Sequence, residues 1–435
     1  MKRIDYPGTW LRDWYAVFVN EMKLIFTDAG VLIIFFVGGL LYPVLYNLIY
    51  MRGMVDDMPV AAVDRSDGAY SRRYLQKVDA TRECEILTAC TSLEEARVLM
   101  QQQKVHGIIY IPADFDERIV RGEQGHISTY ADMSSFLYYK CLTMGTSLTM
   151  LDEMHEIQIE RYAAGGLDGQ SISQLVQPVL ADEEIPYNRP FSYTIFFISA
   201  ALLLVIQQTM FYGGALLAGT LREQNRSFVS LPGHQQGLGV GRVVLGRGAA
   251  YLSVYLVTGT LIALFIPWLF HLPQRAFWGD VLLLLVFYII DCIFFTFTWS
   301  SLIWRRETVF ALFLSVSPIC MFLTGFSWPQ SAIPAFWQRV ACLFPSTFGC
   351  RAFINLNTAG CTLADVAPEL RAIALQTVVY YFLACASAYA ENTIVEHKRR
   401  LAKVRARVDA RLGLPSEEES RRIITGEIRG DEGVQ

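Results

Sequence analysis

Long apolar stretches constrain the fold of this chain more than any other feature of its sequence. Because each helical residue adds about 1.5 Å, a helix needs about 20 mostly apolar residues to cross the roughly 30 Å hydrocarbon core of a bilayer. Six stretches meet or nearly meet this requirement: Val31 to Tyr50, Phe191 to Leu217, Ala249 to Phe270, Val281 to Trp304, Val309 to Phe326 and Ala372 to Ala390. The sequence therefore predicts a helical membrane protein with about six transmembrane helices.

The overall composition agrees with burial in a membrane. Hydrophobic residues make up 53% of the chain, whereas soluble domains contain about 45 to 50%. The formal net charge is only −4, which gives no reason to expect nucleic acid as a partner. The first apolar stretch is too long for the core of a cleaved signal peptide, so we expect an uncleaved signal anchor.

Lysine and arginine predict the orientation, because short loops rich in these residues stay in the cytoplasm. The loops from His271 to Asp280 and from Trp328 to Leu370 contain one and two arginines. The segments predicted on the other side are much more basic, with Lys2, Arg3, Arg12 and Lys23 before the first span, Arg222, Arg226, Arg242 and Arg247 after the second, Arg305 and Arg306 after the fourth, and seven basic residues from Lys398 to Arg411. We therefore expect a multi-pass protein of the bacterial inner membrane with both termini in the cytoplasm.

The segment between the first two spans has the composition of a soluble domain. Its apolar runs alternate with helical patterns and fall at Pro59 to Val63, Glu85 to Thr88, Val105 to Ile111 and Ile127 to Tyr130. Such alternation favours an α/β domain with a mainly parallel sheet. The helical pattern from Ser134 to Tyr162 predicts a stalk that leads back toward the membrane. Cys84 and Cys90 would lie outside the cytoplasm here, as a disulfide or as two unpaired thiols.

These observations divide the chain into nine segments. They are a cytoplasmic interfacial helix (1–28), the first span (29–52), an extracytoplasmic α/β domain (53–189), the second span (190–218), a cytoplasmic loop (219–248), the third to fifth spans (249–326), an external re-entrant segment (327–370), the sixth span (371–391) and a cytoplasmic tail (392–435). The interfacial helix is predicted because apolar residues recur at helical spacing from Trp14 to Ile25 with charged residues between them.

The sequence carries no catalytic or metal-binding constellation. Its nine cysteines and six histidines form no Cys-x-x-Cys pair and no cluster with metal-ligand spacing. The segment from Gly241 to Gly248 has the glycine spacing of a phosphate-binding loop, but Arg247 replaces the lysine and Gly248 replaces the hydroxyl residue that holds magnesium. We therefore expect no bound cofactor and no enzymatic activity of this chain. If the protein uses ATP, another chain must bind it.

Five polar residues inside the apolar stretches are candidates for a translocation path. Asp291 is the one carboxylate well inside a predicted span, where a charge costs about 2.5 to 3.5 kcal/mol. It either contacts a substrate or ion, or is hydrogen-bonded to polar side chains of a neighbouring helix. Gln207, Gln208, Tyr251 and Tyr255 either line the path or hold helices together.

A series of helix breaks follows the fifth span. Gly325, Pro329, Pro334 and Pro345 interrupt helices at a depth where irregular backbone is tolerated only against protein or a water-filled cavity. With Arg351 to Ile354, this series resembles that of ABC-2 type permeases, the membrane subunits of ATP-binding cassette exporters. The layout of one span, a large external domain and five more spans is similar to that of the larger members. The resemblance covers most of residues 31–390.

The resemblance implies a coupling segment after the second span, made by Gly219, Thr220, Glu223, Arg226 and Leu231. Members of the family usually have an acidic stretch that ends in Gly-Thr-x-Glu there. In this chain the glutamate comes one residue late and no acidic residue precedes the glycine. The family also implies ABC ATPase subunits that use ATP and Mg, a second permease that is identical or related, and a mechanism of alternating access. For a member with a large external domain it implies a periplasmic adaptor and an outer-membrane channel.

Two other classes of function compete with this interpretation. The first is a membrane-anchored assembly or sensor protein whose external domain binds a partner, although one or two spans would be enough for that role. The second is a membrane enzyme, which would need several titratable groups at one depth. The basic residues after Glu391 could also contact anionic membrane lipid, or simply anchor the last span on the cytoplasmic side.

Overall fold

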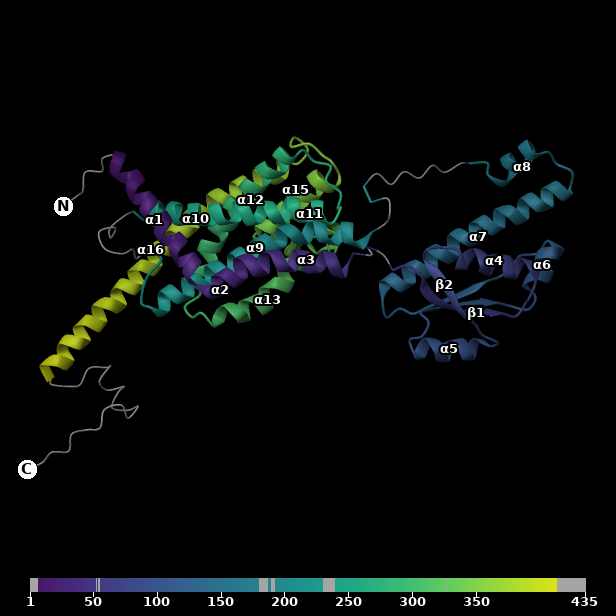
Figure 1. Ribbon diagram of the computed structural model, residues 1–435, viewed down its shortest axis with the longest axis horizontal. Helices are drawn as coiled ribbons and strands as arrows, with labels where there is room; N and C mark the ends of the chain where they lie inside the picture. Colours follow the sequence, from purple (N-terminus) through teal and green to yellow (C-terminus); the bar gives the residue numbers. More distant parts are fainter. Residues whose placement is uncertain are drawn as a thin grey trace, which may run out of the picture. The chain divides into compact units, whose positions relative to one another are not determined.

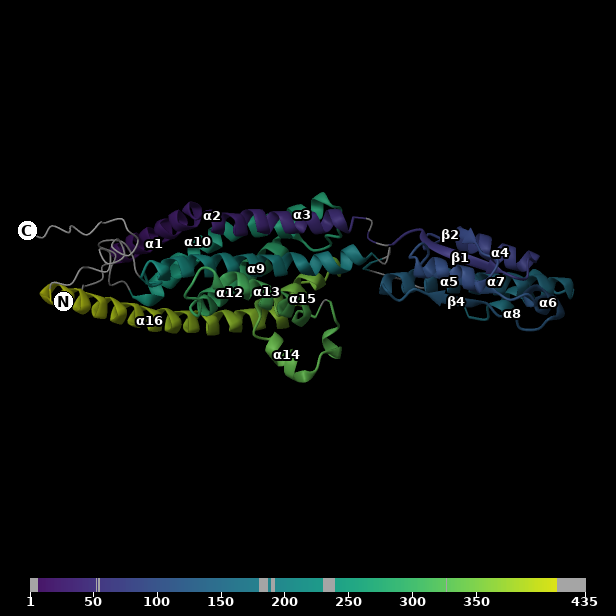
Figure 2. The same ribbon diagram turned by 90° about the horizontal axis from the view of Figure 1, so that it is seen from below.

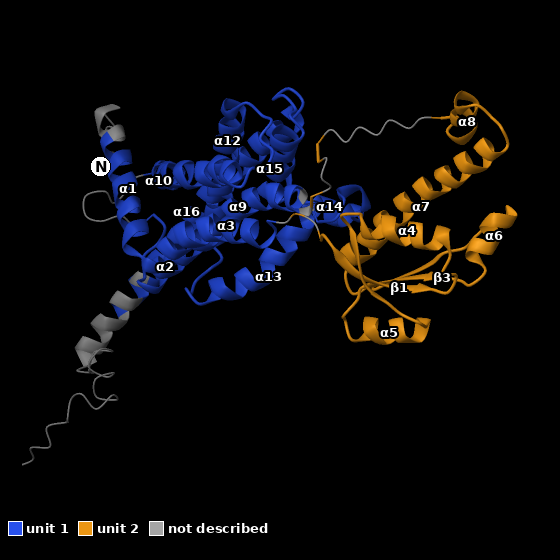
Figure 3. Ribbon diagram, turned by 45° about the vertical axis from the view of Figure 1, so that its right-hand side comes forward, with its two compact units in different colours: residues 1–51, 194–435 blue, residues 52–193 orange. Residues whose placement is uncertain are grey.

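The computed structural model describes residues 7–51, 53, 55–179, 187–188, 192–229, 239–325 and 327–412. The chain forms two compact units (Figure 3). Unit 1 consists of residues 1–51 and 194–435, and unit 2 consists of residues 52–193.

Unit 1 is a helical bundle (Figures 1 and 2). Its helices are α1 (Pro7–Thr27), α2 (Ala29–Leu32), η1 (Ile33–Gly38), α3 (Gly39–Ile49), α9 (Tyr193–Glu223), α10 (Val240–Thr260), η3 (Leu261–Phe265), α11 (Ile266–Leu269), α12 (Trp278–Ser300), α13 (Thr308–Leu323), η4 (Gln330–Ala332), α14 (Ala335–Ala341), α15 (Pro345–Phe353), η5 (Ile354–Thr358) and α16 (Ala367–Leu412). Among them, η1, η3 and η5 are π-helical insertions within longer helices.

Within the described residues, five helical segments are long and apolar enough to cross a membrane. They are Ala29–Ile49, Phe197–Glu223, Val240–Leu269, Trp278–Ser300 and Ala367–Lys398. The fifth predicted span corresponds to α13, which has 16 residues and contains Pro318. At about 1.5 Å per residue such a helix is shorter than the hydrocarbon core. Among the described residues the structure thus has five candidate spans and one shorter apolar helix, and the expected number of about six spans stays a prediction.

Helix α9 lies at the centre of the bundle. Of its span 94% is buried, whereas only 22% of the first span and 22% of the last span is buried, as expected for helices that face lipid. Two adjacent glycines permit this central position. A Cβ added at Gly213 would lie 2.1 Å from the ring of Phe35, and one added at Gly214 would lie 2.5 Å from the methyl group of Thr296. The absence of a side chain at both positions therefore lets neighbouring helices pack closely against α9.

Both ends of the segment predicted as a cytoplasmic loop, residues 219–248, are helical. Helix α9 continues to Glu223, and α10 begins at Val240. The apolar pattern ends early because Arg222 and Arg247 interrupt it, yet both side chains are almost fully buried. Their charges are balanced inside the bundle, so they do not end the helices.

The predicted helix breaks after α13 are all present. Gly325 has a φ of +84°, which an L residue rarely adopts. Pro329 and Pro334 immediately precede η4 and α14, and Pro345 is the first residue of α15. The result is a chain of short helices in place of one long helix. Helix α15 packs between α12 and α16.

Unit 2 contains a four-stranded mixed sheet in the order β2-β1-β3-β4. Its strands are β1 (Met58–Asp64), β2 (Cys84–Ala89), β3 (Gly107–Ile111) and β4 (Ser128–Ala131), and its helices are α4 (Ala69–Asp79), α5 (Leu93–Gln101), α6 (Phe115–Arg121), α7 (Phe136–Ala164) and α8 (Gly169–Val176). Strands β1, β2 and β3 are parallel, and β4 pairs antiparallel to β3. All four predicted strands are thus present, and the mainly parallel arrangement is confirmed for three of them. Helices α6 and α8 were not predicted, because they span only seven and eight residues.

Two apolar clusters cover the two faces of this sheet. One contains Cys84 together with residues of α4 and α7, and the other contains Cys90 together with Ala96 of α5. The two cysteines lie at opposite ends of β2 and both are free thiols. A disulfide between them is therefore excluded, and the alternative of unpaired thiols holds.

Helix α7, which was predicted as a stalk, packs against the sheet of its own unit. It buries Cys141, Leu142, Gly145 and Ile157 and contacts α4 and all four strands. Its long helical pattern predicted the helix correctly. Its apolar residues are spaced along one face because this face of α7 packs on the sheet of unit 2.

Candidate functional site

Charged residues and one threonine from four segments of unit 1 meet at the C-terminal end of α9. We call the group the α9 cluster, and it consists of Asp28, Thr220, Arg222, Glu223, Arg306 and Glu391. These residues come from the start of the first span, the last turn of α9, the turn between α12 and α13, and α16. Thr220 and Glu223 belong to the predicted coupling segment.

Arg306 organises one half of the α9 cluster. Its two terminal nitrogens donate to the two carboxylate oxygens of Asp28, at 2.8 and 2.7 Å, a bidentate geometry that combines charge with direction. The same guanidinium donates to the hydroxyl of Thr220 at 3.0 Å, and the Arg306 backbone N–H donates to Glu223 at 2.8 Å. A Cβ at Gly219 would lie 3.0 Å from that backbone nitrogen. Gly219 therefore lets α9 approach the turn closely.

Asp28 has a second role, because it caps α2. Its carboxylate accepts from the backbone N–H groups of Gly30 at 3.0 Å and Val31 at 3.2 Å. Partial burial alone would raise the pKa of Asp28, but the hydrogen bonds from Arg306 and from these amides outweigh it and lower the pKa. The carboxylate is thus held in its charged form beside Arg306.

Arg222 and Glu391 form the other half of the α9 cluster. The Arg222 guanidinium donates to Glu391 at 2.7 Å, and both side chains are at least 96% buried. Arg222 also donates to the backbone oxygen of Ser300 at 2.6 Å and to that of Ile303. The other oxygen of Glu391 accepts from the backbone N–H of Phe228 at 2.9 Å. This half ties the ends of α9 and α12 to α16.

A separate buried ion pair joins α1 to α10. Arg247 and Glu21 lie 3.1 Å apart, with only 1% of each side chain exposed, and the Arg247 guanidinium lies over the ring of Phe228. Burial raises the pKa of Glu21 despite the attraction of Arg247. The segment from Gly241 to Gly248 is part of α10. Its glycine spacing therefore does not form a phosphate-binding loop.

The sequence identified only part of the α9 cluster. Gly219, Thr220 and Glu223 belong to it or contact it. Arg226 lies in the turn after α9, where its N–H donates to the Leu221 oxygen at 2.8 Å, and Leu231 lies outside the described residues. Asp28, Arg222, Arg306 and Glu391 were not predicted as site residues. Arg222 and Arg306 stood out only as basic residues near span ends, and their partners are 169 and 278 residues away.

All five path candidates are buried within the bundle. The amide oxygen of Gln207 accepts from the backbone N–H of Ser346 at 2.6 Å. Tyr255 donates to Thr209 at 3.2 Å, and Tyr251 packs edge-on against the ring of Phe35. These three side chains contact neighbouring helices, and their role in a translocation path stays a prediction.

The fourth buried candidate, Asp291, has no hydrogen-bond partner for either carboxylate oxygen within the described part of the chain, and it is 0% exposed. The expected hydrogen bonds to polar side chains of a neighbouring helix are therefore absent there. Burial of an ionised carboxylate without hydrogen bonds costs free energy. Among the described residues Asp291 is thus a buried group without an assigned polar contact.

The fifth candidate, Gln208, lines a groove between the first span, α9 and α13. The groove has a volume of about 530 Å³. Its lining is largely apolar, with polar groups only from Gln208, Thr209, Tyr212, Ser317, Tyr42 and Tyr46. The hydroxyl groups of Tyr212 and Ser317 lie 3.0 Å apart across it. Among the described residues the lining has no charged side chain, and the groove can therefore accept an apolar molecule with a few hydrogen-bonding groups.

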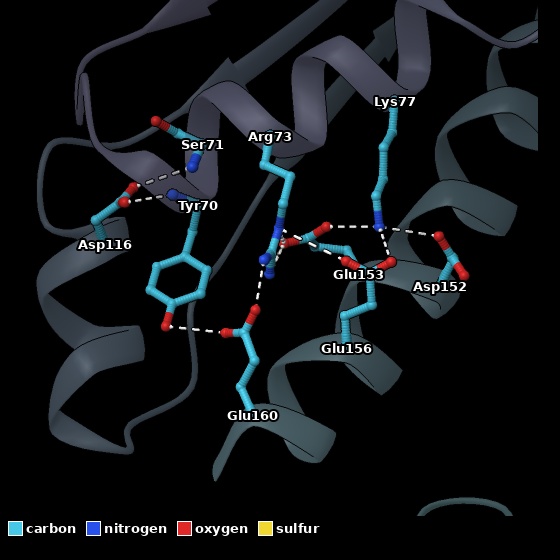
Figure 4. A network of polar contacts seen from close by, with 9 residues as sticks. All are labelled: Tyr70, Ser71, Arg73, Lys77, Asp116, Asp152, Glu153, Glu156 and Glu160. Atoms are coloured by element: carbon cyan, nitrogen blue, oxygen red, sulfur yellow. Dashed lines mark hydrogen bonds and ion pairs between the residues drawn. The ribbon is translucent and has the colours of Figure 1, made fainter. Parts of the chain in front are cut away.

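Unit 2 has a charged network of its own between α4 and α7. Arg73 and Lys77 of α4 contact Asp152, Glu153, Glu156 and Glu160 of α7 (Figure 4). On the other side, Asp116 of α6 accepts from the backbone N–H groups of Tyr70 and Ser71. Each cation faces several carboxylates, so the network joins helices. No group of three metal-ligating side chains occurs among the residues that the structure describes.

Comparison with known proteins agrees with these features. No curated protein matches the sequence. A family model described as ABC-2 family transporter protein matches residues 29–386, a range that begins at the first span and ends within α16. This range contains most of the chain, the groove and four of the six residues of the α9 cluster. The other two, Asp28 and Glu391, lie just outside it. The chain is therefore a membrane protein of the ABC-2 transporter family and a permease component.

Proposed function

We propose that this chain is the permease subunit of an ATP-driven exporter and that a separate ATPase docks at the segment after α9. The α9 cluster carries this proposal. The last turn of α9 is bonded through Arg306 to the first span and through Arg222 to α12 and α16. A force applied just beyond Glu223 would therefore reach four membrane helices through direct bonds.

The groove lined by Gln208 supports the proposal of a translocation path. In the proposed complex the groove faces a second permease, identical or related, and the two chains enclose the path. ATP binding and hydrolysis in the partner would open the path alternately to the two sides of the membrane. The absence of charge from the groove lining favours an uncharged or amphipathic substrate.

The proposed orientation follows from the basic residues. In this orientation the protein lies in a bacterial inner membrane, with the α9 cluster, both termini and the end of α16 in or near the cytoplasm. Unit 2 then lies on the external side. A periplasmic adaptor, with an outer-membrane channel beyond it, is the proposed partner of unit 2. The mixed sheet and the free thiols of unit 2 are compatible with such a binding domain and supply no chemistry of their own.

Co-purification tests the docking. The tagged chain is extracted gently from its native host, and the bound proteins are identified and quantified by mass spectrometry. Recovery of a cassette ATPase is expected. Arg226→Glu should reduce its recovery, while the matched control Lys23→Glu, on the exposed face of α1, should not. Glu223 is left intact because it bonds the Arg306 backbone.

The same experiment separates the alternative function. Recovery of the intact membrane protein without any ATPase, under conditions that retain other partners, would contradict the transporter proposal. It would favour a membrane-anchored assembly or sensor protein. Equal ATPase recovery for Arg226→Glu and the wild type would leave the family assignment in place but exclude this docking segment.

A further inference from the structure

Glu391 joins the segment after α9 directly to the last membrane helix. One carboxylate oxygen accepts from Arg222 of α9 at 2.7 Å, and the other accepts from the Phe228 backbone N–H at 2.9 Å. The adjacent residue Asn392 accepts from the hydroxyl of Ser227 at 2.8 Å. Two successive residues of α16 thus hold two successive residues of the turn.

The burial of these groups makes the connection rigid. Ser227 is fully buried, and Phe228 and Glu391 are nearly so. The Phe228 ring packs edge-on against Phe297 of α12, while Arg222 binds the backbone at the end of α12. Charge-assisted hydrogen bonds out of contact with water are the strong ones. The turn therefore cannot shift without moving α16 or breaking several of these bonds.

We infer that Glu391 is a positioning residue that transmits movement of the docking segment to α16. This inference rests on the proposed function, since it assumes that an ATPase acts on the turn after α9. It adds a specific route to that proposal. The last span responds to nucleotide through the two oxygens of Glu391, independently of the Arg306 half of the α9 cluster.

Hydrogen–deuterium exchange in the permease–ATPase complex can test this route without knowledge of the substrate. The complex is compared without nucleotide and with ATP plus vanadate, using peptides from residues 221–229 and from residues 386–398. In the wild type both peptides should change their exchange on nucleotide binding. In Glu391→Ala the first peptide should still respond, and the response of the second should be lost.

Three further variants make the result specific. Glu391→Gln keeps an oxygen that can accept from Phe228, so it should restore part of the α16 response. Asn392→Ala removes the Ser227 bond without a change of charge and should weaken the response, which keeps the test decisive if Glu391→Ala folds poorly. His397→Ala, on the exposed part of α16, is the matched control and should respond like the wild type.

The outcomes distinguish this inference from the proposed function. A full α16 response in both Glu391→Ala and Asn392→Ala would overturn the role of Glu391. If the wild-type peptide 221–229 does not respond although ATPase is bound, the docking proposal fails first. A merely structural role of Glu391 would lower the responses of both peptides together, and this result would also contradict the inference.

Discussion

The two units use ion pairs in different ways. In unit 1 the pairs Arg222–Glu391 and Arg247–Glu21 are almost completely buried. In unit 2, Arg73 and Lys77 form a network whose carboxylates, apart from Glu153, are 42 to 65% exposed. A buried charge that loses its partner costs about 3 to 5 kcal/mol, whereas an exposed pair contributes about 0 to 1 kcal/mol. Ion pairs should therefore be essential to unit 1 and largely dispensable in unit 2.

The largest effect is expected at the α1–α10 pair. Glu21→Leu leaves the Arg247 guanidinium buried without its carboxylate and should lower the free energy of unfolding by about 3 to 5 kcal/mol. Thermal unfolding of the detergent-solubilised protein measures the loss. The double variant Glu21→Met, Arg247→Met removes both charges and should be much closer to the wild type. Equal losses in the single and the double variant would show that packing, and not charge, dominates this contact.

A smaller effect is expected at Asp28, which is only partly buried. Asp28→Ala removes both the cap of α2 and the bidentate pair with Arg306. Loss of the cap alone should cost about 0.5 to 2 kcal/mol. Asp28→Asn retains an oxygen for the amides of Gly30 and Val31 and should recover most of the cap. The difference between the two variants in thermal unfolding gives the cap's share, and no difference would assign the whole effect to Arg306.

The sequence predicted most of the helices but not the charges that join them. Apolar length identified each long span, and glycine and proline identified the breaks around α14 and α15. The apolar pattern placed the end of α9 and the start of α10 at the wrong residues. Charged residues such as Arg222 and Arg247 indicate the end of a span unless their partners are known. Those partners, Glu391 and Glu21, are near in space only after folding. A single sequence contains no signal for such long-range pairing.

In unit 2 two glutamates one turn apart provide a matched comparison. Glu153 is nearly buried and contacts both Arg73 and Lys77, whereas Glu156 is 42% exposed. Glu156→Ala should change stability by less than about 1 kcal/mol, as for other exposed pairs. Glu153→Ala should cost more, because its carboxylate is nearly buried between the same two cations, where water cannot replace it. Limited proteolysis of unit 2 within the intact chain measures both, and a larger effect at Glu156 would contradict the distinction by burial.

The smallest effects should distinguish the units by the sign of their pH dependence. In unit 2, the hydrogen bond with His106 and the Ser134 amide lower the pKa of Asp132 below its ordinary 3.8. Its stabilising contribution is present above pH 3.8 and is lost as the pH falls through the lowered value. In unit 1, burial raises the pKa of Glu21 above 4.5. Glu21 therefore stays protonated to a higher pH in the folded state than in the unfolded state. This group lowers the stability of the folded state as the pH rises above 4.5.

Unfolding of the whole protein as a function of pH can separate the two groups. Asp132→Asn should flatten the acid side of the stability profile. Glu21→Gln should reduce the loss of stability as the pH rises above 4.5. Both variants keep the size and a hydrogen-bonding oxygen of the side chain, so a change in slope reports the proton and not the packing. If Glu21→Gln leaves the slope unchanged, the attraction of Arg247 must fully offset burial. The buried pair would then behave like the exposed pairs of unit 2, and the contrast between the units would rest on geometry alone.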